Sequence, residues 1–134
     1  MHSAALANQN PAGKTVLVVD DAPDIREMLN FMLSLKGCRV VEAANGREAV
    51  ELAPQIRPDL ILMDLSMPVL DGYEATRRIH GRRETSAIPI VAVSAFCDPH
   101  GQQKALEAGC VECVGKPVDF RLLDRLLETH LQTH

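Results

Sequence analysis

The sequence predicts a single α/β domain with a doubly wound, five-stranded parallel sheet. Short apolar runs rich in Val, Ile and Leu alternate with amphipathic segments of helical period, and this strand–helix pair occurs five times. The 134 residues, 46% of them apolar and 24% charged, suffice for one globular domain with its own core. Right-handed crossovers between parallel strands place helices on both faces of such a sheet.

The first strand–helix pair follows a polar N-terminal segment. Residues 1–13 are expected to form a mobile tail, so the domain is placed at 14–134. The Val-rich run Thr15–Val19 indicates a strand buried on both faces. A helix should begin at Pro23 and stop at Gly37. Its inward face is predicted to carry Ile25, Met28, Leu29, Met32 and Leu33.

The middle of the chain contains the next two pairs. A strand is expected at Arg39–Ala43, followed by a helix over Gly46–Ala53. Pro54 should end this helix, because proline has no N–H to donate. The third strand is predicted at Leu60–Met63. After the loop LSMPVLDG, a helix should run over Tyr73–His80.

The last two pairs follow the polar link GRRETSA. The pattern predicts a fourth strand at Ile88–Val93, a helix at Pro99–Ala108, a short fifth strand at Val111–Val114 and a closing helix at Asp119–Leu131. The closing helix is expected to turn inward Phe120, Leu123, Leu127 and Leu131.

Charge and hydropathy exclude several classes of protein. The 14 Lys and Arg against 18 Asp and Glu give a net charge of −4, whereas a nucleic-acid-binding face would be basic. No apolar run approaches the roughly 18 residues of a membrane span. The N-terminus also lacks the basic and apolar regions of a signal peptide. We therefore expect a cytoplasmic protein without direct contact to nucleic acid or membrane.

Polar side chains follow the predicted strands, at the edge where open parallel sheets bind ligands. The residues at these positions are Asp20, Asp21, Asp64, Ser94 and Lys116. Adjacent carboxylates repel each other and are best tolerated beside a cation. Candidates for that cation are a metal ion and the Lys116 ammonium.

Carboxylates with oxygen donors suit a hard divalent ion such as Mg²⁺. The sequence contains no GxxxxGK[ST] phosphate loop and no GxGxxG fingerprint, which disfavours nucleotide binding. No histidine lies at a strand end to act as a general base. A carboxylate beside Mg²⁺ and a lysine can instead attack phosphorus and form an aspartyl phosphate.

The motifs VVDD, ILMDLSMPVLDG, VAVSA and GKP occur in this order and at matching separations. With these motifs, the chain from about Thr15 to Leu131 resembles a receiver domain of the bacterial response-regulator family. The resemblance implies a (βα)5 flavodoxin-like three-layer sandwich with strand order 2-1-3-4-5. It also implies a signalling module of a two-component system or phosphorelay, with no substrate of its own. Its only chemistry would be self-catalysed phosphoryl transfer to its own Asp, and autodephosphorylation.

The resemblance assigns a role to each polar residue. Asp64 would accept a phosphoryl group from a sensor histidine kinase or a phosphotransfer protein. Asp21 would bind Mg²⁺ directly, with Asp20 assisting and the backbone carbonyl of Ser66 adding an oxygen; Mn²⁺ is an alternative ion. Ser94 and Lys116 would bind phosphoryl oxygens.

The same resemblance implies backbone features and a mode of output. Pro117 matches the family's cis-proline, and Asp71-Gly72 matches its turn before the third helix. Movement of Ser94 would change the surface of the fourth helix, fifth strand and fifth helix, and so control a downstream protein. The state would be a monomer or a weak phosphorylation-linked dimer.

The chain departs from the family pattern at one position. Three residues before the lysine, the family usually carries an aromatic ring that changes rotamer, and this chain carries Cys113. We expect incomplete switching through the fourth helix instead. Ser66 and Phe96 occupy the positions that tune phosphate lifetime.

Two other functions compete with this interpretation. A Mg²⁺-dependent phosphatase would carry a D-x-D-x-T run and a cap domain, but this chain has DDAPD and is short. A pseudo-receiver would have lost an acid, the hydroxyl or the lysine, and all are present. Either a stand-alone receiver or a piece of a hybrid kinase or longer regulator fits the sequence.

The four cysteines are Cys38, Cys97, Cys110 and Cys113. Cys110 and Cys113 have CxxC spacing, but no second CxxC or HxxxH completes a zinc site. A cytosolic chain with a good core needs no disulfides. We therefore expect four free thiols without structural metal.

Overall fold

The computed structural model describes residues 13–65, 67, 70–95 and 97–131. Within them, five parallel strands form one sheet in the order β2-β1-β3-β4-β5. The predicted fold class and strand order are therefore confirmed. Expectations for the tail up to residue 12, for Ser66 and for Phe96 fall outside the described residues.

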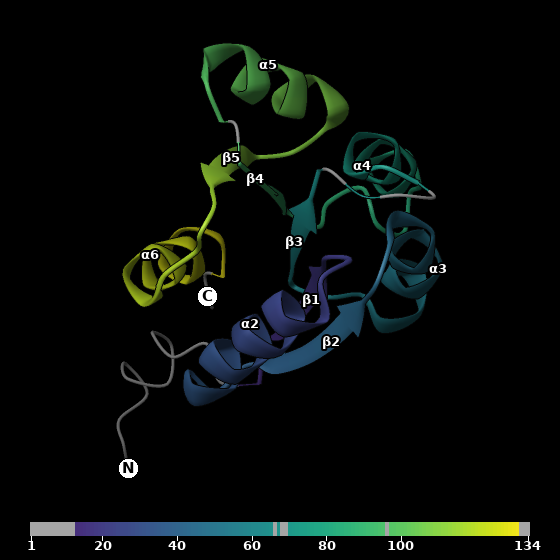
Figure 1. Cartoon of the computed structure of the whole chain (residues 1–134). Helices are drawn as coiled ribbons and strands as arrows, with labels where there is room; N and C mark the ends of the chain where they lie inside the picture. The colour runs from purple at the N-terminus through teal and green to yellow at the C-terminus, as the bar shows by residue number, and fades with distance from the viewer. Residues whose placement is uncertain (1–12, 66, 68–69, 96, 132–134) are drawn as a thin grey trace.

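The elements alternate along the chain as predicted (Figure 1). The strands are β1 (Thr15–Val19), β2 (Arg39–Ala43), β3 (Leu60–Asp64), β4 (Ile90–Ser94) and β5 (Glu112–Gly115). The helices of the described part are α2 (Pro23–Leu35), α3 (Gly46–Ile56), α4 (Gly72–His80), α5 (Pro99–Ala108) and α6 (Phe120–His130).

The sheet separates two hydrophobic cores. Helices α2 and α6 lie on one face of the sheet, and α3, α4 and α5 lie on the other (Figure 1). The side chains of each group of helices form a separate core with the strand residues of that face. Successive residues of β1 illustrate the division, since Val16 and Val18 belong to the first core and Leu17 and Val19 to the second. Burial on both faces explains why the strand sequences are continuous apolar runs instead of alternating apolar and polar residues.

Strand register brings the polar strand ends to one edge. Val19 of β1 lies opposite Met63 of β3, and Ser94 of β4 lies opposite Gly115 of β5. The residues that directly follow or end these strands therefore share the carboxyl edge of the sheet.

Several element boundaries differ from the prediction, and two of them differ by two or more residues. Helix α3 continues through Pro54 to Ile56 and ends where Arg57 takes a left-handed conformation with φ 46°. Strand β4 begins at Ile90 instead of Ile88, because the N–H of Ile88 donates to Thr85 in a turn and Pro89 has no N–H.

A predicted core residue of the closing helix lies at the surface. Phe120 is 45% exposed, and the Lys36 ammonium lies 4.9 Å from the centre of its ring. Leu126 is buried in the core on this side instead, together with the predicted Leu123 and Leu127.

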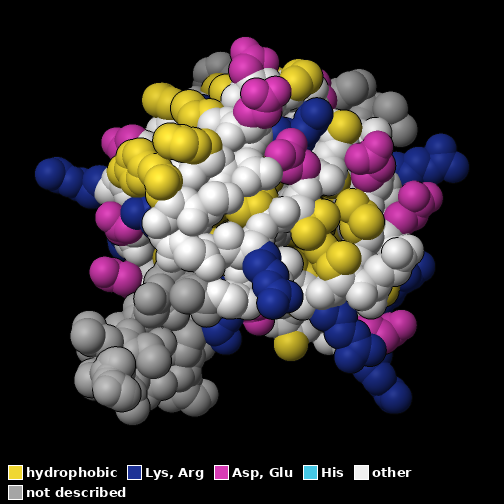
Figure 2. All heavy atoms as spheres, turned by 90° about the horizontal axis from the view of Figure 1, so that it is seen from below, with side chains coloured by type: hydrophobic (Ala, Val, Ile, Leu, Met, Phe, Trp, Pro, Cys, Tyr) yellow, Lys and Arg dark blue, Asp and Glu magenta, His cyan; other side chains and the backbone are white. Residues whose placement is uncertain are grey.

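The surface of α2 also carries large apolar side chains. Phe31 and Leu35 are 64% and 63% exposed, and the predicted core residue Met28 is 40% exposed. Figure 2 shows groups of hydrophobic side chains among charges of both signs on the face seen from below. Among the described residues, no helix combines the length and the apolar character that crossing a bilayer requires.

Candidate functional site

Three carboxylates meet at the carboxyl edge of the sheet. Asp20 follows β1 and Asp64 ends β3, and these two residues are 3% and 2% exposed. Asp21 is exposed. One carboxylate oxygen from each of the three lies within 4.8 Å of the others. The structure thus brings together the three acids that the sequence predicted to meet.

Lys116 reaches this cluster from the end of β5. Its ammonium nitrogen lies 3.4 Å from Asp64 Oδ1 and 3.7 Å from Asp20 Oδ2. The Lys116–Pro117 peptide bond is cis, as the resemblance implied. Because one ammonium faces three carboxylates, two of them buried, the cluster keeps an excess of negative charge that a divalent cation would balance.

Ser94 is the last residue of β4 and is buried. Its backbone carbonyl accepts a hydrogen bond of 2.9 Å from the N–H of Lys116. Ser94 and Lys116 therefore sit on neighbouring strands at the same edge as the acids.

Arg26 was not identified from the sequence as part of the site. It donates from Nη1 to the backbone carbonyl of Asp20 at 2.7 Å, and its Nε pairs with Glu42 at 3.2 Å. Asn30 donates to the other oxygen of Glu42 at 2.7 Å. The Asp20 carboxylate also accepts from the N–H of Ala22. These contacts hold the turn after β1, and the only sequence signal for them was an arginine in the first turn of a helix.

Gly72 allows close backbone contact behind Asp64. A Cβ at Gly72 would lie 2.3 Å from the backbone oxygen of Asp64 and 2.7 Å from the Cα of Leu65. The N–H of Gly72 donates to the carbonyl of Leu65, and Asp71 caps α4 by accepting from the N–H of Glu74. The Asp-Gly pair thus starts α4 against the end of β3.

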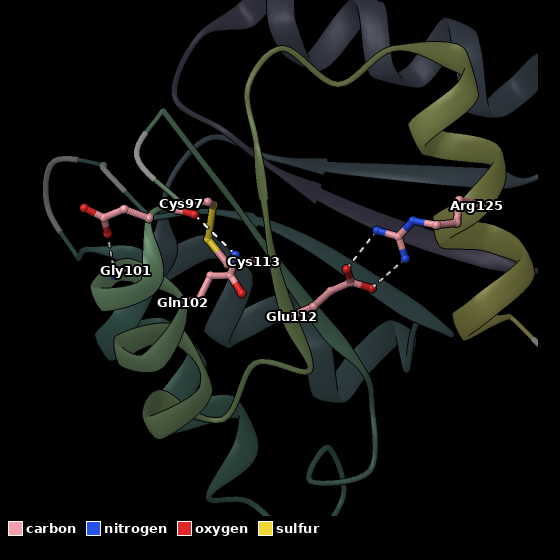
Figure 3. The surroundings of a disulfide bond; sticks show 7 residues. Cys97, Gly101, Gln102, Glu112, Cys113 and Arg125 are labelled. Carbon is pink, nitrogen blue, oxygen red and sulfur yellow. Dashed lines mark hydrogen bonds and ion pairs between the residues drawn. A yellow bond between two sulfur atoms is a disulfide. The ribbon is translucent and has the colours of Figure 1, made fainter.

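The expectation of four free thiols is wrong for two cysteines. Cys97 and Cys113 form a disulfide with a Cα–Cα distance of 6.0 Å, which is ordinary for such a bond (Figure 3). The pair with CxxC spacing is not joined, because the loop after β4 lies beside β5 and brings Cys97 to Cys113.

The other two cysteines, Cys38 and Cys110, are free and buried. Burial raises the pKa of both thiols. Cys110 lies 3.8 Å from the hydroxyl of Thr76, a contact that opposes part of the rise. Both are core thiols rather than reactive groups.

The sequence is similar to those of known signalling proteins. Residues 16–128 match the family model described as the response regulator receiver domain. The protein PilH of Pseudomonas aeruginosa is 39% identical over 81% of this chain and 89% of its own length. A protein-glutamate methylesterase/protein-glutamine glutaminase of Hahella chejuensis is 42% identical over 76% of this chain, but only 30% of that enzyme is covered.

A solved structure has the same arrangement of elements. The receiver domain of a sensor histidine kinase from Pseudomonas aeruginosa superposes with a TM-score of 0.83 and 37% identity, covering 90% of this chain and 98% of that chain. In that structure a magnesium ion is coordinated in the active-site cleft.

Proposed function

The chain belongs to the response regulator receiver domain family, and we propose that Asp64 is the carboxylate that accepts the phosphoryl group in it. One observation carries this proposal: Asp64 is buried at the end of β3, within the acid cluster and 3.4 Å from the Lys116 ammonium. A buried carboxylate with an adjacent cation is positioned to receive a phosphoryl group whose negative charge needs a partner.

We propose that Asp20, Asp21 and Asp64, with the backbone carbonyl of Ser66, hold Mg²⁺, or Mn²⁺ as an alternative. The three carboxylate oxygens within 4.8 Å of one another support the part of this ligand set that the acids supply. When bound, the ion would supply positive charge that offsets the carboxylates and the phosphoryl oxygens.

The residues of the chain would divide the transfer between them. An Asp64 oxygen attacks phosphorus, and the bond to the donor nitrogen of a phosphohistidine breaks. The Lys116 ammonium, already 3.4 Å from Asp64, pairs with one phosphoryl oxygen. The Ser94 hydroxyl donates to another from the adjacent strand. Water later hydrolyses the aspartyl phosphate, so the domain acts only on itself.

The same proposal covers partners and location. The donor would be a sensor histidine kinase or a phosphotransfer protein, and the acceptor of the signal would be a downstream protein in the cytoplasm. The surface of α5, β5 and α6 would carry the change, because α5 follows the Ser94 loop and β5 precedes Lys116.

A small phosphodonor tests the proposal directly. The chain treated with acetyl phosphate and Mg²⁺ should gain one phosphoryl group by intact mass, and a chelator should abolish the gain. Uptake that is unchanged by the chelator, or more than one group per chain, would contradict the assignment.

Asp21→Asn should weaken Mg²⁺ binding at least tenfold, about 1.4 kcal/mol, because it removes the exposed carboxylate of the cluster. Isothermal titration with Mg²⁺ measures this change. Asp24→Asn is the matched control, since Asp24 is an exposed acid in the first turn of α2 outside the cluster. Equal Mg²⁺ affinity in the two variants would remove Asp21 from the site.

A further inference from the structure

The disulfide joins the two chain segments that carry Ser94 and Lys116. Cys97 is the third residue after Ser94, and Cys113 is the third residue before Lys116. The same segments are joined at their other end by the hydrogen bond from the N–H of Lys116 to the carbonyl of Ser94. The covalent bond therefore closes a small ring at the edge of the acid cluster.

The Cys97 end of this ring is continuous with α5. Asp98 caps α5 by accepting from the N–H of Gly101 at 2.8 Å. Gln102 donates from its side chain to the carbonyl of Cys97 at 3.3 Å (Figure 3). A displacement of the loop after Ser94 would therefore move the start of α5 with it.

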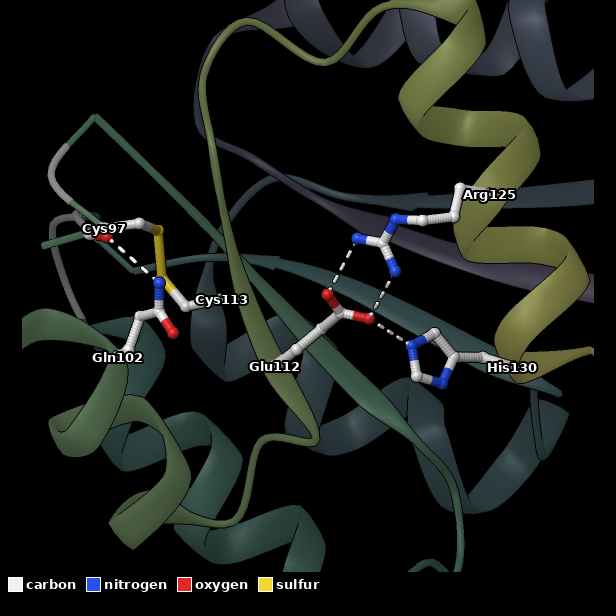
Figure 4. Close-up of polar contacts among 6 residues, drawn as sticks. All are labelled: Cys97, Gln102, Glu112, Cys113, Arg125 and His130. Carbon is white, nitrogen blue, oxygen red and sulfur yellow. Dashed lines mark hydrogen bonds and ion pairs between the residues drawn. A yellow bond between two sulfur atoms is a disulfide. The ribbon is translucent and has the colours of Figure 1, made fainter. Parts of the chain in front are cut away.

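The Cys113 end belongs to a strand that is held from the opposite face. Glu112, the preceding residue of β5, accepts two hydrogen bonds from Arg125 at 2.9 and 3.2 Å and lies 2.6 Å from His130 Nε2 (Figure 4). Hydrogen bonding to Arg125 holds the pKa of Glu112 below its usual value. The disulfide thus ties a loop to a strand that α6 anchors.

We propose that Cys97 and Cys113 form a reversible thiol–disulfide switch that limits the movement of the Ser94 loop and α5 when a phosphoryl group occupies the site. This regulation rests on the function proposed above. In a reducing compartment, the disulfides that do occur are usually catalytic or redox-sensing. The oxidised domain would respond more weakly to phosphorylation than the reduced domain.

The exchange chemistry uses a dithiol reductant. Cys97 is half-buried, whereas Cys113 is only 8% exposed, so Cys97 is the sulfur that a reductant reaches. A thiolate of the reductant attacks the sulfur of Cys97, and Cys113 leaves as a thiolate and takes up a proton. The second thiol of the reductant then attacks the mixed disulfide and releases Cys97. Two electrons and two protons reach the protein, and the reductant becomes a disulfide; a disulfide oxidant reverses the reaction.

Thermodynamic linkage makes the switch reciprocal. If the disulfide lowers the affinity for a phosphoryl mimic by a given factor, bound mimic must raise the equilibrium constant for reduction of the disulfide by the same factor. For a tenfold effect, the midpoint potential of the disulfide should rise by about 30 mV when the mimic is bound. The two quantities are measured independently.

Beryllofluoride with Mg²⁺ is the probe, and titration calorimetry on the full chain gives its affinity. We expect binding to be about tenfold tighter after reduction than after oxidation. Cys97→Ser and Cys113→Ser should bind as the reduced protein does under both conditions. Cys38→Ala and Cys110→Ala, which remove the free thiols, should keep the tenfold difference.

Hydrogen exchange without the mimic tests the tether itself. Amides of the segment 97–111 should exchange faster in the reduced protein and in Cys97→Ser than in the oxidised protein. Three results would each overturn the switch. They are equal exchange rates in the two redox forms, equal beryllofluoride affinity in the two redox forms, and four titratable thiols in the denatured chain after oxidation. Failure of both redox forms to bind beryllofluoride would overturn the phosphoacceptor proposal instead, and the exchange result would still decide the tether.

Discussion

Asp64→Asn is expected to abolish phosphoryl uptake from acetyl phosphate, with no added mass on the intact chain. The amide has nearly the shape of the carboxylate but lacks the anionic oxygen that attacks phosphorus. Asp20 and Asp64 are both buried, and of the two Asp64 lies nearer to the Lys116 ammonium, at 3.4 Å against 3.7 Å. Asp20 and Asp21 remain in the variant, and we expect them to keep their proposed role as metal ligands rather than to attack phosphorus.

The same substitution should leave the fold intact. It relieves repulsion among three carboxylates that lie within 4.8 Å of one another, and it removes the ion pair with Lys116. Because these effects oppose each other, the free energy of unfolding should change by less than about 1 kcal/mol. Asp124→Asn, at an exposed acid of α6, serves as the matched control and should take up one phosphoryl group. If Asp64→Asn still gains that mass while folded, another residue is the acceptor.

Gly72→Ala should be strongly destabilising, by about 3 kcal/mol in urea unfolding. The added Cβ would lie 2.3 Å from the backbone oxygen of Asp64 and 2.7 Å from the Cα of Leu65. Both are backbone atoms of a buried segment, so neither can rotate away as the end of a flexible side chain would. The end of β3 must shift, and phosphoryl uptake at Asp64 should slow as well.

Gly115→Ala is the control for this effect. The nearest atom to a Cβ at Gly115 is the carbonyl oxygen of Ser94 at 4.0 Å, so the stability should change by less than about 0.5 kcal/mol. A Gly72→Ala protein as stable as Gly115→Ala would mean that β3 and α4 separate easily. In that case the close packing behind Asp64 would not position the carboxylate.

Local patterns in the sequence were sufficient to predict the elements and their order. Strands such as Thr15–Val19 and helices such as Pro99–Ala108 agree with the structure residue for residue, because apolar periodicity and stop signals act over short distances. The meeting of Asp20 with Asp64 could also be predicted, since parallel strands place their carboxyl ends at one edge.

Other features depended on neighbours that local patterns do not identify. Pro54 lies inside α3, and that helix ends only where Arg57 takes a left-handed conformation. Phe120 has the periodicity of a core residue, yet its ring lies beside Lys36, which is distant in sequence. Arg26 supports the turn after β1 through Glu42 of the adjacent strand.

The sequence by itself determined the α/β class, the strand-end acids and the lysine that accompanies them, because each depends on residue type and short-range spacing. Tertiary structure decided which cysteines pair. Local spacing pointed to Cys110 and Cys113, whereas the bond joins Cys97 and Cys113 across 16 residues. That pairing exists because β4 and β5 are neighbours in register, with Ala92 opposite Cys113, so the loop that leaves β4 passes beside β5. Contact between such segments is set by strand pairing, which no single stretch of sequence contains.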